Sequence, residues 1–417
     1  MCKILNTDVL IIGGGASGLT SAITVKSLNP KLNVIIAERL SRTGKKILAT
    51  GNGRCNLGNT NISKDYYHGS VRNYMDIIHS VPNITDFFSS IGLYCVNDEM
   101  GRIYPYSNSA ASVLNVLRNK INELGIKEVC DFNVINIEKC DNYFKIYNNE
   151  TNQINAKRVL ISAGGCAGNS LGTDGSMLQL LEKKGHIITP LYPSIAPLAV
   201  NPAALKGLKG VRVKGIASAL FNEKILASEK GEIQFNENNI SGICIFNLSY
   251  LYAEYGNKLK ISIDICPDKT VSDVTSILIK LKEINIKNDL ENYLVGLFNK
   301  NLSTYLIKSI GRKLNESVSS LKNDDINLLA KKIKSLEFSI VGKSEWKNAQ
   351  VTYGGISGTC VDRKLQSKIM DELYFAGEIL DVDGLCGGYN LTWAWASGIY
   401  AGTKVAESFG GKNDKSK

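Results

Sequence analysis

Residues 8–28 read DVLIIGGGASGLTSAITVKSL, and this stretch decides the fold. Residues 8–12 form a short, mainly apolar run that is typical of a strand buried on both faces of a parallel sheet. Gly13, Gly15 and Gly18 then match G-x-G-x-x-G, and the next ten residues have the apolar spacing of a helix. In such a loop one glycine permits a tight turn, the next lets backbone N–H groups approach a pyrophosphate, and the third lets the helix pack on the strand. The stretch therefore predicts a phosphate-binding loop at the positive end of a helix.

The next predicted strand, NVIIAE, ends in Glu38, which lies twenty residues after Gly18. An acidic side chain at this distance is expected to bind a ribose hydroxyl of a dinucleotide. A carboxylate here would also repel the 2′-phosphate of NADP, so we expect FAD or NAD. A structural glycine turn followed by a chance acid is the alternative. The candidate cofactor-binding residues of this unit are Gly13, Gly15, Ala16, Ser17, Gly18, Glu38 and Arg39.

The other end of the chain favours FAD over NAD. Residues 371–402 read DELYFAGEILDVDGLCGGYNLTWAWASGIYAG, which predicts a strand ending at AGE, a loop with two aspartates, and a helix opening at GGYN. FAD is long enough to need a second contact stretch, and the helix dipole would favour the negative charge that a reduced flavin ring carries. The candidate residues here are Gly377, Glu378, Asp381, Gly388, Tyr389, Asn390 and Leu391.

Two segments in the middle of the chain support the same site. AKRVLISAGG, residues 156–165, predicts a buried strand that ends in a glycine turn, with Ala163 and Gly164 near the dinucleotide. DFNVINIEKCDNYFKIY alternates as a small hairpin does, and the Val134 backbone is a candidate contact to adenine. Both segments also suit plain sheet without a ligand.

The loop GNGRCNLGN, residues 51–59, raises the question of a redox cysteine. A flavin-linked dithiol needs C-x-x-x-x-C, but Thr60 stands five residues after Cys55, so no local disulfide can form. A lone reactive thiol remains an alternative. We expect instead that the loop presses its backbone and polar side chains on the cofactor or substrate, through Lys45, Gly51, Gly53, Arg54, Cys55 and Asn56.

Composition limits the other classes of function. The 417 residues carry a net charge of +10, but the lysines are interspersed with acids, so we expect a solvated surface and consider a nucleic-acid partner unlikely. The ten cysteines contain no C-x-x-C and the three histidines are far apart in sequence, so we expect no metal site. With no long apolar run and no signal peptide, we expect a cytoplasmic protein without a membrane partner.

These motifs together resemble the BaiN-like bacterial flavoproteins, also described as aminoacetone-oxidase-like FAD-binding proteins. The resemblance rests on IIGGGASGL, GKKILATGNGRCNLGN, GRIYPYSNSA, VTYGGIS and LYFAGEILDVDGLCGGYNLTWAWASG, and it covers nearly the whole chain. It implies an α/β fold: a Rossmann-like FAD-binding domain of the glutathione-reductase/fumarate-reductase type, split by an inserted β-rich domain that itself carries a helical insert. We expect the FAD-binding domain at residues 1–190 and 350–417, the β-rich domain at 191–268 and 335–349, and the helical insert at 269–334.

The resemblance also implies the reaction. We expect an FAD-dependent oxidoreductase that reduces an electron-poor C=C bond, such as the enone of a 3-oxo-steroid or bile-acid-like substrate. Arg54 and Tyr389 are the candidate catalytic residues, although each could merely hold the cofactor. No second G-x-G-x-x-G follows a predicted strand, so NADH or NADPH would bind only transiently as the electron donor. The alternatives are a flavin amine or aminoketone oxidase using O2, an RNA-acting flavoprotein, and a non-catalytic redox sensor. The sequence leaves the oligomeric state open.

Overall fold

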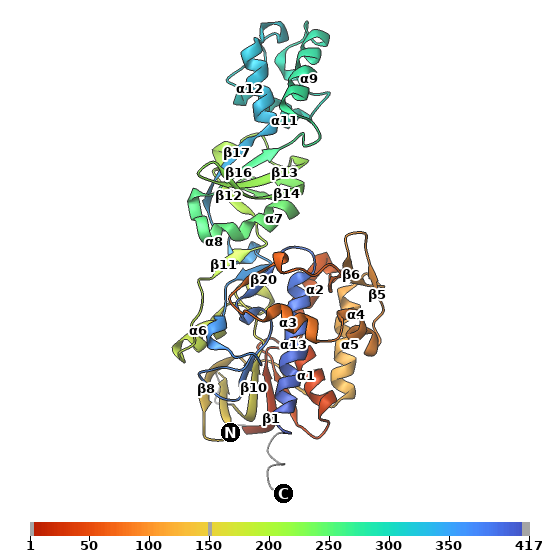
Figure 1. The fold of residues 1–417 in the computed structure, drawn as a ribbon, viewed down its shortest axis with the longest axis vertical. Coiled ribbons are helices and arrows are strands. Elements are labelled where there is room, and N and C mark those ends of the chain that lie inside the picture. The colour runs from red at the N-terminus through yellow and green to blue at the C-terminus, as the bar shows by residue number, and fades with distance from the viewer. Residues whose placement is uncertain (1–3, 149–151, 411–417) are drawn as a thin grey trace. The chain divides into compact units, whose positions relative to one another are not determined.

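The computed structural model describes residues 4–148 and 152–410 (Figure 1). The chain forms two compact units, one from residues 1–192 and 349–417 and the other from residues 193–348. The first unit therefore contains both ends of the chain. The finer division into three domains stays a prediction.

A parallel sheet forms the centre of the first unit. Its middle strand, β1 (Ile4–Ile12), pairs with β2 (Val34–Ala37) on one side and β10 (Gln153–Ile161) on the other. β7 (Lys127–Val129) pairs with β2, and β19 (Leu373–Phe375) pairs with the last three residues of β10. All four pairings are parallel, and residues 9–12 are buried because elements of the chain cover both faces of the sheet. The Rossmann-like architecture predicted from sequence is confirmed.

An antiparallel hairpin extends this sheet beyond the first half of β10. It consists of β8 (Val134–Lys139) and β9 (Phe144–Asn148), and β9 pairs with residues 153–156 of β10. The predicted hairpin is thus confirmed, and β9 and β19 share one edge of β10.

Two helices from opposite ends of the sequence pack together in this unit. α1 (Ala16–Leu28) follows the glycine loop, and α13 (Tyr389–Glu407) runs alongside it (Figure 1). The small residues that the sequence places on α13 make this close approach possible. A Cβ on Gly398 would lie 2.5 Å from the Ser17 carbonyl oxygen, so the two backbones are nearly in contact.

Shorter elements complete the first unit. Two small antiparallel sheets place β6 (Arg102–Pro105) between β3 (Gly58–Asn59) and β5 (Cys95–Asn97), and β4 (Tyr67–Gly69) against β20 (Val382–Gly384). The remaining helices and strands of this unit are α2 (Lys45–Ala49), α3 (Tyr74–Ser80), α4 (Ile84–Ser90), α5 (Ala110–Glu123), α6 (Ser176–Lys183) and β18 (Val351–Tyr353). β11 (Tyr192–Ser194) lies where the chain passes from the first unit to the second.

The second unit is built around a closed antiparallel barrel. The strands follow the order β12-β15-β14-β13-β16-β17, and their side chains alternate between buried and exposed positions, as in β17. The strands are β12 (Leu198–Val200), β13 (Arg212–Phe221), β14 (Lys224–Phe235), β15 (Asn239–Ser241), β16 (Lys260–Asp264) and β17 (Leu336–Gly342).

Helices lie between the strands of the barrel along the chain. The predicted extent of one of these helices is wrong. The apolar spacing of LENYLVGLFNK predicts a single helix over residues 290–300, but residues 294–299 form a turn between α10 (Leu290–Tyr293) and the next helix, which begins at Lys300. Leu297 and Phe298 both donate to the Leu294 carbonyl in a turn, and Asn299 caps the next helix by accepting from the Leu302 N–H. The other helices are α7 (Ile243–Leu248) and α8 (Tyr252–Tyr255), which the sequence did not predict, and α9 (Val271–Ile284), α11 (Lys300–Ser309) and α12 (Asn323–Lys334).

Candidate functional site

The three glycines of the first loop have three different environments. Gly13 has a φ of +101°, and a Cβ there would lie 2.6 Å from the Ser162 carbonyl oxygen at the end of β10. A Cβ on Gly18 would lie 1.9 Å from the Gly13 oxygen, so this glycine lets the helix pack on the loop. Nothing lies within 4 Å of a Cβ on Gly15, which therefore faces open space. Ala16 and Ser17 form the first turn of α1, and no side chain caps that turn.

Glu38 stands at the end of β2, where the sequence predicted it, but its carboxylate binds backbone. Oε2 accepts from the Gly14 N–H at 2.8 Å and Oε1 from the Leu40 N–H at 2.9 Å, and only 8% of the residue is exposed. Each carboxylate oxygen keeps a second lone pair that a ribose hydroxyl can use. Glu38 also accepts from the Phe132 N–H through its carbonyl, and this bond brings the segment before Val134 to the same edge.

The neighbours of Glu38 make ionic and backbone contacts. Arg39 forms an ion pair with Asp174, with Nη1 and Oδ1 2.7 Å apart. Burial alone would raise the pKa of Asp174, but the Arg39 guanidinium and bonds from Ser176 outweigh it and lower that pKa to about 2. Lys45 is exposed, and its Nζ donates to the Ser170 carbonyl at 3.1 Å. Ala163 follows β10 and lies beside Gly13.

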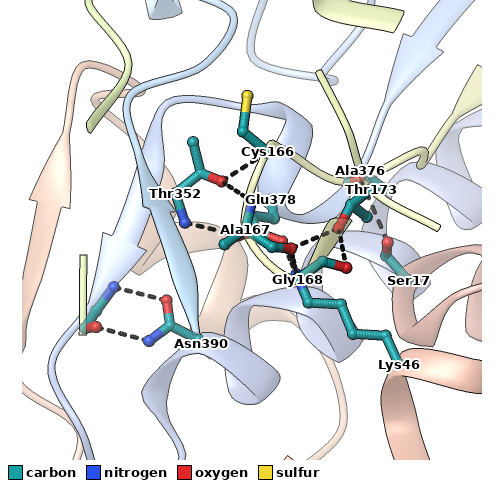
Figure 2. Close-up of polar contacts among 11 residues, drawn as sticks. Ser17, Lys46, Cys166, Ala167, Gly168, Thr173, Thr352, Ala376, Glu378 and Asn390 are labelled. Atoms are coloured by element: carbon teal, nitrogen blue, oxygen red, sulfur yellow. Dashed lines mark hydrogen bonds and ion pairs between the residues drawn. The ribbon is translucent and has the colours of Figure 1, made fainter. Parts of the chain in front are cut away.

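Polar contacts join five distant stretches of the chain (Figure 2). Lys46, rather than the predicted Lys45, reaches into this region and forms an ion pair with Glu378 at 2.7 Å. The other oxygen of Glu378 accepts from the Thr352 N–H at 2.8 Å, and Thr352 Oγ1 accepts from the Cys166 and Ala167 N–H groups. Gly164 lies nearby, since a Cβ on it would be 3.7 Å from Glu378 Oε2. Ser17 completes the group by donating weakly to the Ala376 carbonyl at 3.4 Å.

The loop that contains Cys55 is shaped by its backbone. Gly51 and Gly53 have positive φ, and a Cβ on Gly53 would meet nothing within 4 Å. Cys55 also has a positive φ, of 56°, and its thiol is fully buried. Burial raises the pKa of this thiol to about 12, which argues against a reactive thiolate. Arg54 is exposed, and its guanidinium lies 4.8 Å from the centroid of the Tyr104 ring.

The last candidate cofactor-binding residues of the C-terminal stretch lie in and just before the first turn of α13. Gly388 precedes the helix with a φ of +102°, and a Cβ there would lie 2.8 Å from Asn56 Oδ1, so the two loops are adjacent. Tyr389 stacks on Tyr66 with ring centroids 4.7 Å apart, and burial raises its pKa to about 12. Asn390 holds the preceding strand by binding both the N–H and the carbonyl of Gly384. Leu391 is half-buried in the same turn.

The two aspartates before α13 have different partners. Asp381 accepts from Ser70 Oγ at 2.6 Å, a bond that ties β4 to the stretch before β20. Asp383 is 1% exposed, and its Oδ2 lies 3.4 Å from Nδ1 of His68. Desolvation raises the pKa of the Asp383 carboxyl, although His68 acts in the opposite direction. Neither a role for His68 nor this pairing was predicted from sequence; the available signal was the repeated aspartate in DVD.

The residues present fit an elongated dinucleotide. Neither α1 nor α13 has a side-chain cap or an acid in its first turn, so both helix ends keep N–H groups for an anionic or carbonyl ligand. Two buried oxygens near the start of α13, Asn56 Oδ1 and Asp383 Oδ1, have no hydrogen-bond partner in the described part of the chain. The open space at Gly15 adds room for a pyrophosphate. Bound FAD would therefore lie against the first loop, residues 51–56 and the start of α13.

Fold and site together define a Rossmann-type flavoprotein. The chain matches the family described as HI0933-like protein Rossmann domain over residues 7–404, and it belongs to this family of FAD-dependent oxidoreductases. The resemblance stated from sequence is confirmed.

The curated relatives have two different activities. The chain is 35% identical to the 3-dehydro-bile acid delta(4,6)-reductase of Clostridium scindens, and the match covers 95% of this chain and 98% of the relative. It is 25% identical to the ribosomal RNA dihydrouridine synthase of Haemophilus influenzae, over 94% of this chain and 96% of the relative. The corresponding Escherichia coli synthase is 23% identical.

Solved structures agree with the fold. A 3-ketosteroid delta1-dehydrogenase from Sterolibacterium denitrificans has a TM-score of 0.52 at 12% identity, covering 97% of this chain and 100% of that one. A quinol-fumarate reductase has a TM-score of 0.50 at 13% identity, covering 99% and 73%.

The described residues contain neither a membrane-spanning helix nor a cluster of metal ligands. No described helix has the length and apolar character needed to cross a bilayer. Within residues 4–148 and 152–410, no three His, Cys, Asp or Glu side chains are grouped as metal ligands are. No disulfide joins two cysteines within these ranges.

Proposed function

We propose that this protein reduces a C=C bond conjugated to a ketone in a steroid-like or bile-acid-like small molecule. The observation that carries the proposal is the 35% identity to a 3-dehydro-bile acid delta(4,6)-reductase over nearly the full length of both chains. The uncapped starts of α1 and α13 and the unpartnered oxygens of Asn56 and Asp383 support a flavin at the reacting centre. When bound and reduced, the flavin supplies hydride.

The side chains at the start of α13 suit the carbonyl end of such a substrate. Hydride addition to the conjugated system moves negative charge onto the carbonyl oxygen, and a nearby donor or cation stabilises that charge. Arg54 carries a permanent positive charge on the exposed loop, and Tyr389 stays protonated at neutral pH because burial raises its pKa to about 12. We propose that one of these two groups binds the carbonyl oxygen.

NADH or NADPH is the proposed electron donor. The sequence offers no second dinucleotide motif, so the donor would bind at the substrate side of the flavin, reduce it and leave before the substrate enters. Anaerobic stopped-flow with each nucleotide tests this order. We expect the flavin absorbance near 450 nm to bleach with one of them, and no bleaching by either would exclude this donor class.

The reaction itself is tested with the FAD-loaded protein under anaerobic conditions. We expect the reduced protein to be reoxidised by a 3-oxo-4,6-diene bile acid or steroid, with a product two hydrogens heavier by mass spectrometry. Reoxidation by O2 alone, with hydrogen peroxide released in the presence of an amine, would favour the oxidase alternative instead.

The variants Tyr389→Phe and Arg54→Ala test the proposed carbonyl contact. If either group stabilises the developing charge, its loss should slow turnover by about 10²-fold or more while the flavin stays bound. The flavin absorbance of each purified variant separates this effect from cofactor loss. A variant that keeps both its flavin and its wild-type rate removes that residue from the mechanism.

A second candidate function is reduction of uridine in ribosomal RNA, and two relatives at 25% and 23% identity favour it. The chemistry is related, because the uracil C5=C6 bond is also conjugated to a carbonyl. The net charge of +10 suits a polyanionic substrate, but many of the lysines are paired with acids. We therefore place this function second.

Salt dependence distinguishes the two candidates. RNA binding through phosphate contacts should weaken steeply as salt concentration rises, whereas turnover of a steroid enone should change little. Dihydrouridine formed in ribosomal RNA, with no turnover of the dienone, would reverse the order of the two proposals.

A further inference from the structure

Asp383 and His68 form a buried pair that the proposed hydride transfer does not use. The two residues face each other across the antiparallel pair of β20 and β4, with Asp383 directly opposite His68 in register. Asp383 Oδ2 lies 3.4 Å from His68 Nδ1, and the exposed fractions of the two side chains are 1% and 20%. Asp383 Oδ1 is buried without a hydrogen-bond partner in the described chain. A buried carboxylate with an unused oxygen is costly unless a ligand or a function accounts for it.

The pair lies at the proposed reaction site. Asn390, in the first turn of α13, binds both backbone groups of Gly384, the residue directly after Asp383. A Cβ on Gly384 would lie 2.8 Å from Cβ of Tyr389 and 3.2 Å from the Tyr66 carbonyl. Asp383 therefore lies in the same region of the unit as the stacked Tyr66 and Tyr389 and the Asn56 oxygen that has no hydrogen-bond partner in the described chain.

The chemistry requires a proton that Tyr389 and Arg54 supply poorly. A phenol with a pKa of about 12 and a guanidinium both hold their protons tightly near neutral pH. Histidine is the side chain type whose charge normally changes between pH 5 and 8. A group that exchanges its proton in this range is the better general acid.

We propose that His68 is the proton carrier of the reduction and that Asp383 is its positioning residue, an inference that rests on the proposed function. A bound, reduced flavin would supply a hydride to the distal carbon of the conjugated system, so that the C=C π electrons would move toward the carbonyl. The proton from the His68 imidazolium then forms the second C–H bond, at the carbon where the electron pair collects. His68 regains a proton from water through its exposed edge, so hydride and proton together add the two hydrogens of the product.

The groups around the pair influence whether the Asp383 carboxyl is ionised. Three charged or titratable groups act on Asp383: His68 from β4, Glu378 from the stretch after β19, and Asp381 from its own stretch. The ring of Tyr353 on β18 lies 6.4 Å from that of His68. The two neighbouring acids oppose ionisation of Asp383, whereas a protonated His68 favours it. Replacing Asp383 by neutral Asn removes the carboxylate that faces Nδ1 of His68.

NMR of the histidine rings tests the pairing without any turnover. The chain has three histidines, so the ring signals of the FAD-loaded full-length protein can be assigned by substitution. We expect Asp383→Asn to shift the His68 ring signals at fixed pH, because the ring loses the carboxylate beside its Nδ1. His79→Gln is the matched control, because His79 is exposed on α3 and should leave the His68 ring signals unchanged. Identical His68 ring signals in the wild type and Asp383→Asn would overturn the proposal.

The pH profile of turnover tests the role. We expect Asp383→Asn to slow turnover at unchanged flavin content and to alter the pH profile of kcat, because the carboxylate no longer positions the imidazole. His68→Gln should slow turnover by about 10²- to 10⁴-fold at unchanged flavin content. Wild-type turnover in His68→Gln would overturn the proposal. If Asp383→Asn fails to fold, the His68→Gln result alone decides whether the proposal holds. If the wild type reduces no enone, the proposed function fails, whereas a failed NMR arm beside an active wild type overturns this inference alone.

Discussion

At the scale of single residues, burial decides which cysteine thiols can react, and sequence spacing alone does not show this. Cys55 stands in the loop beside the proposed flavin, and its position alone left a reactive thiol open. The residue is fully buried, and the resulting rise of its pKa to about 12 keeps the thiol protonated at physiological pH. Its φ of 56° shows instead that the loop backbone bends sharply at this position.

We therefore expect Cys55 to resist alkylation. In the native protein at pH 8, iodoacetamide should leave Cys55 unmodified while the half-buried Cys140 reacts, as peptide mass mapping would show. The Cys55→Ala variant should keep its flavin and at least half of the wild-type turnover. Rapid labelling of Cys55, or a loss of turnover at full flavin content, would restore the reactive-thiol interpretation.

At the scale of elements, ion pairs and close helix contacts hold distant stretches around the site. Lys46 comes from α2 and Glu378 from the stretch after β19, and both side chains are largely shielded from water. Shielding strengthens such a pair. In the pair of Lys120 and Glu123 on α5, by contrast, the Glu123 side chain is 64% exposed, so water and salt screen the interaction.

A double-mutant cycle measures this difference. With Lys46→Met and Glu378→Gln, we expect a coupling of about 1–3 kcal/mol in the free energy of unfolding, because the bond between the two charged groups is shielded. The same cycle with Lys120→Met and Glu123→Gln should give less than about 0.5 kcal/mol. Equal couplings, measured by urea unfolding, would show that the Lys46–Glu378 pair does not hold the site together.

The close contact between α1 and α13 predicts that replacing a glycine of α13 by alanine lowers the stability of the protein. Gly→Ala in a helix normally stabilises by up to about 1 kcal/mol. A Cβ on Gly398, however, would lie 2.4 Å from Thr20 Oγ1 and 2.5 Å from the Ser17 oxygen, so Gly398→Ala should destabilise by about 1–3 kcal/mol. Gly296→Ala is the control, because nothing lies within 4 Å of its Cβ. An unchanged melting temperature in Gly398→Ala would mean that the helices separate easily.

At the scale of the whole molecule, the two compact units have separate cores. The barrel and helices of residues 193–348 share one hydrophobic cluster, which includes Ile261, Phe235, Phe338 and Leu329. The proposed FAD contacts all lie in the other unit. A ligand stabilises only the unit that binds it, unless the two units unfold together.

Calorimetry of the apoprotein with added FAD tests this independence. We expect two transitions, of which only one moves upward with FAD, by about 2.7 kcal/mol in stability at a hundredfold excess over Kd. The same scan with ADP should move the same transition by less. A single transition that shifts as a whole would show that the units unfold cooperatively.

The sequence by itself determined the class of fold and the cofactor. G-x-G-x-x-G after a buried strand, Glu38 at the end of the next strand, and GGYN at the start of the last helix are local signals, and each depends on backbone geometry that neighbouring residues impose. The predicted positions of Gly13, Gly15 and Glu38 agree with the structure for this reason.

Only the tertiary structure decided which side chains meet. His68 and Asp383 are 315 residues apart in sequence, and only the pairing of β4 with β20 brings them together. Lys46 rather than Lys45 reaches Glu378 because the short helix α2 turns adjacent lysines in different directions. The burial that raises the pKa of Cys55 likewise comes from packing, which local sequence patterns do not encode. Local patterns fix the backbone that binds a cofactor, whereas the proton chemistry beside it depends on contacts between segments that only the complete fold creates.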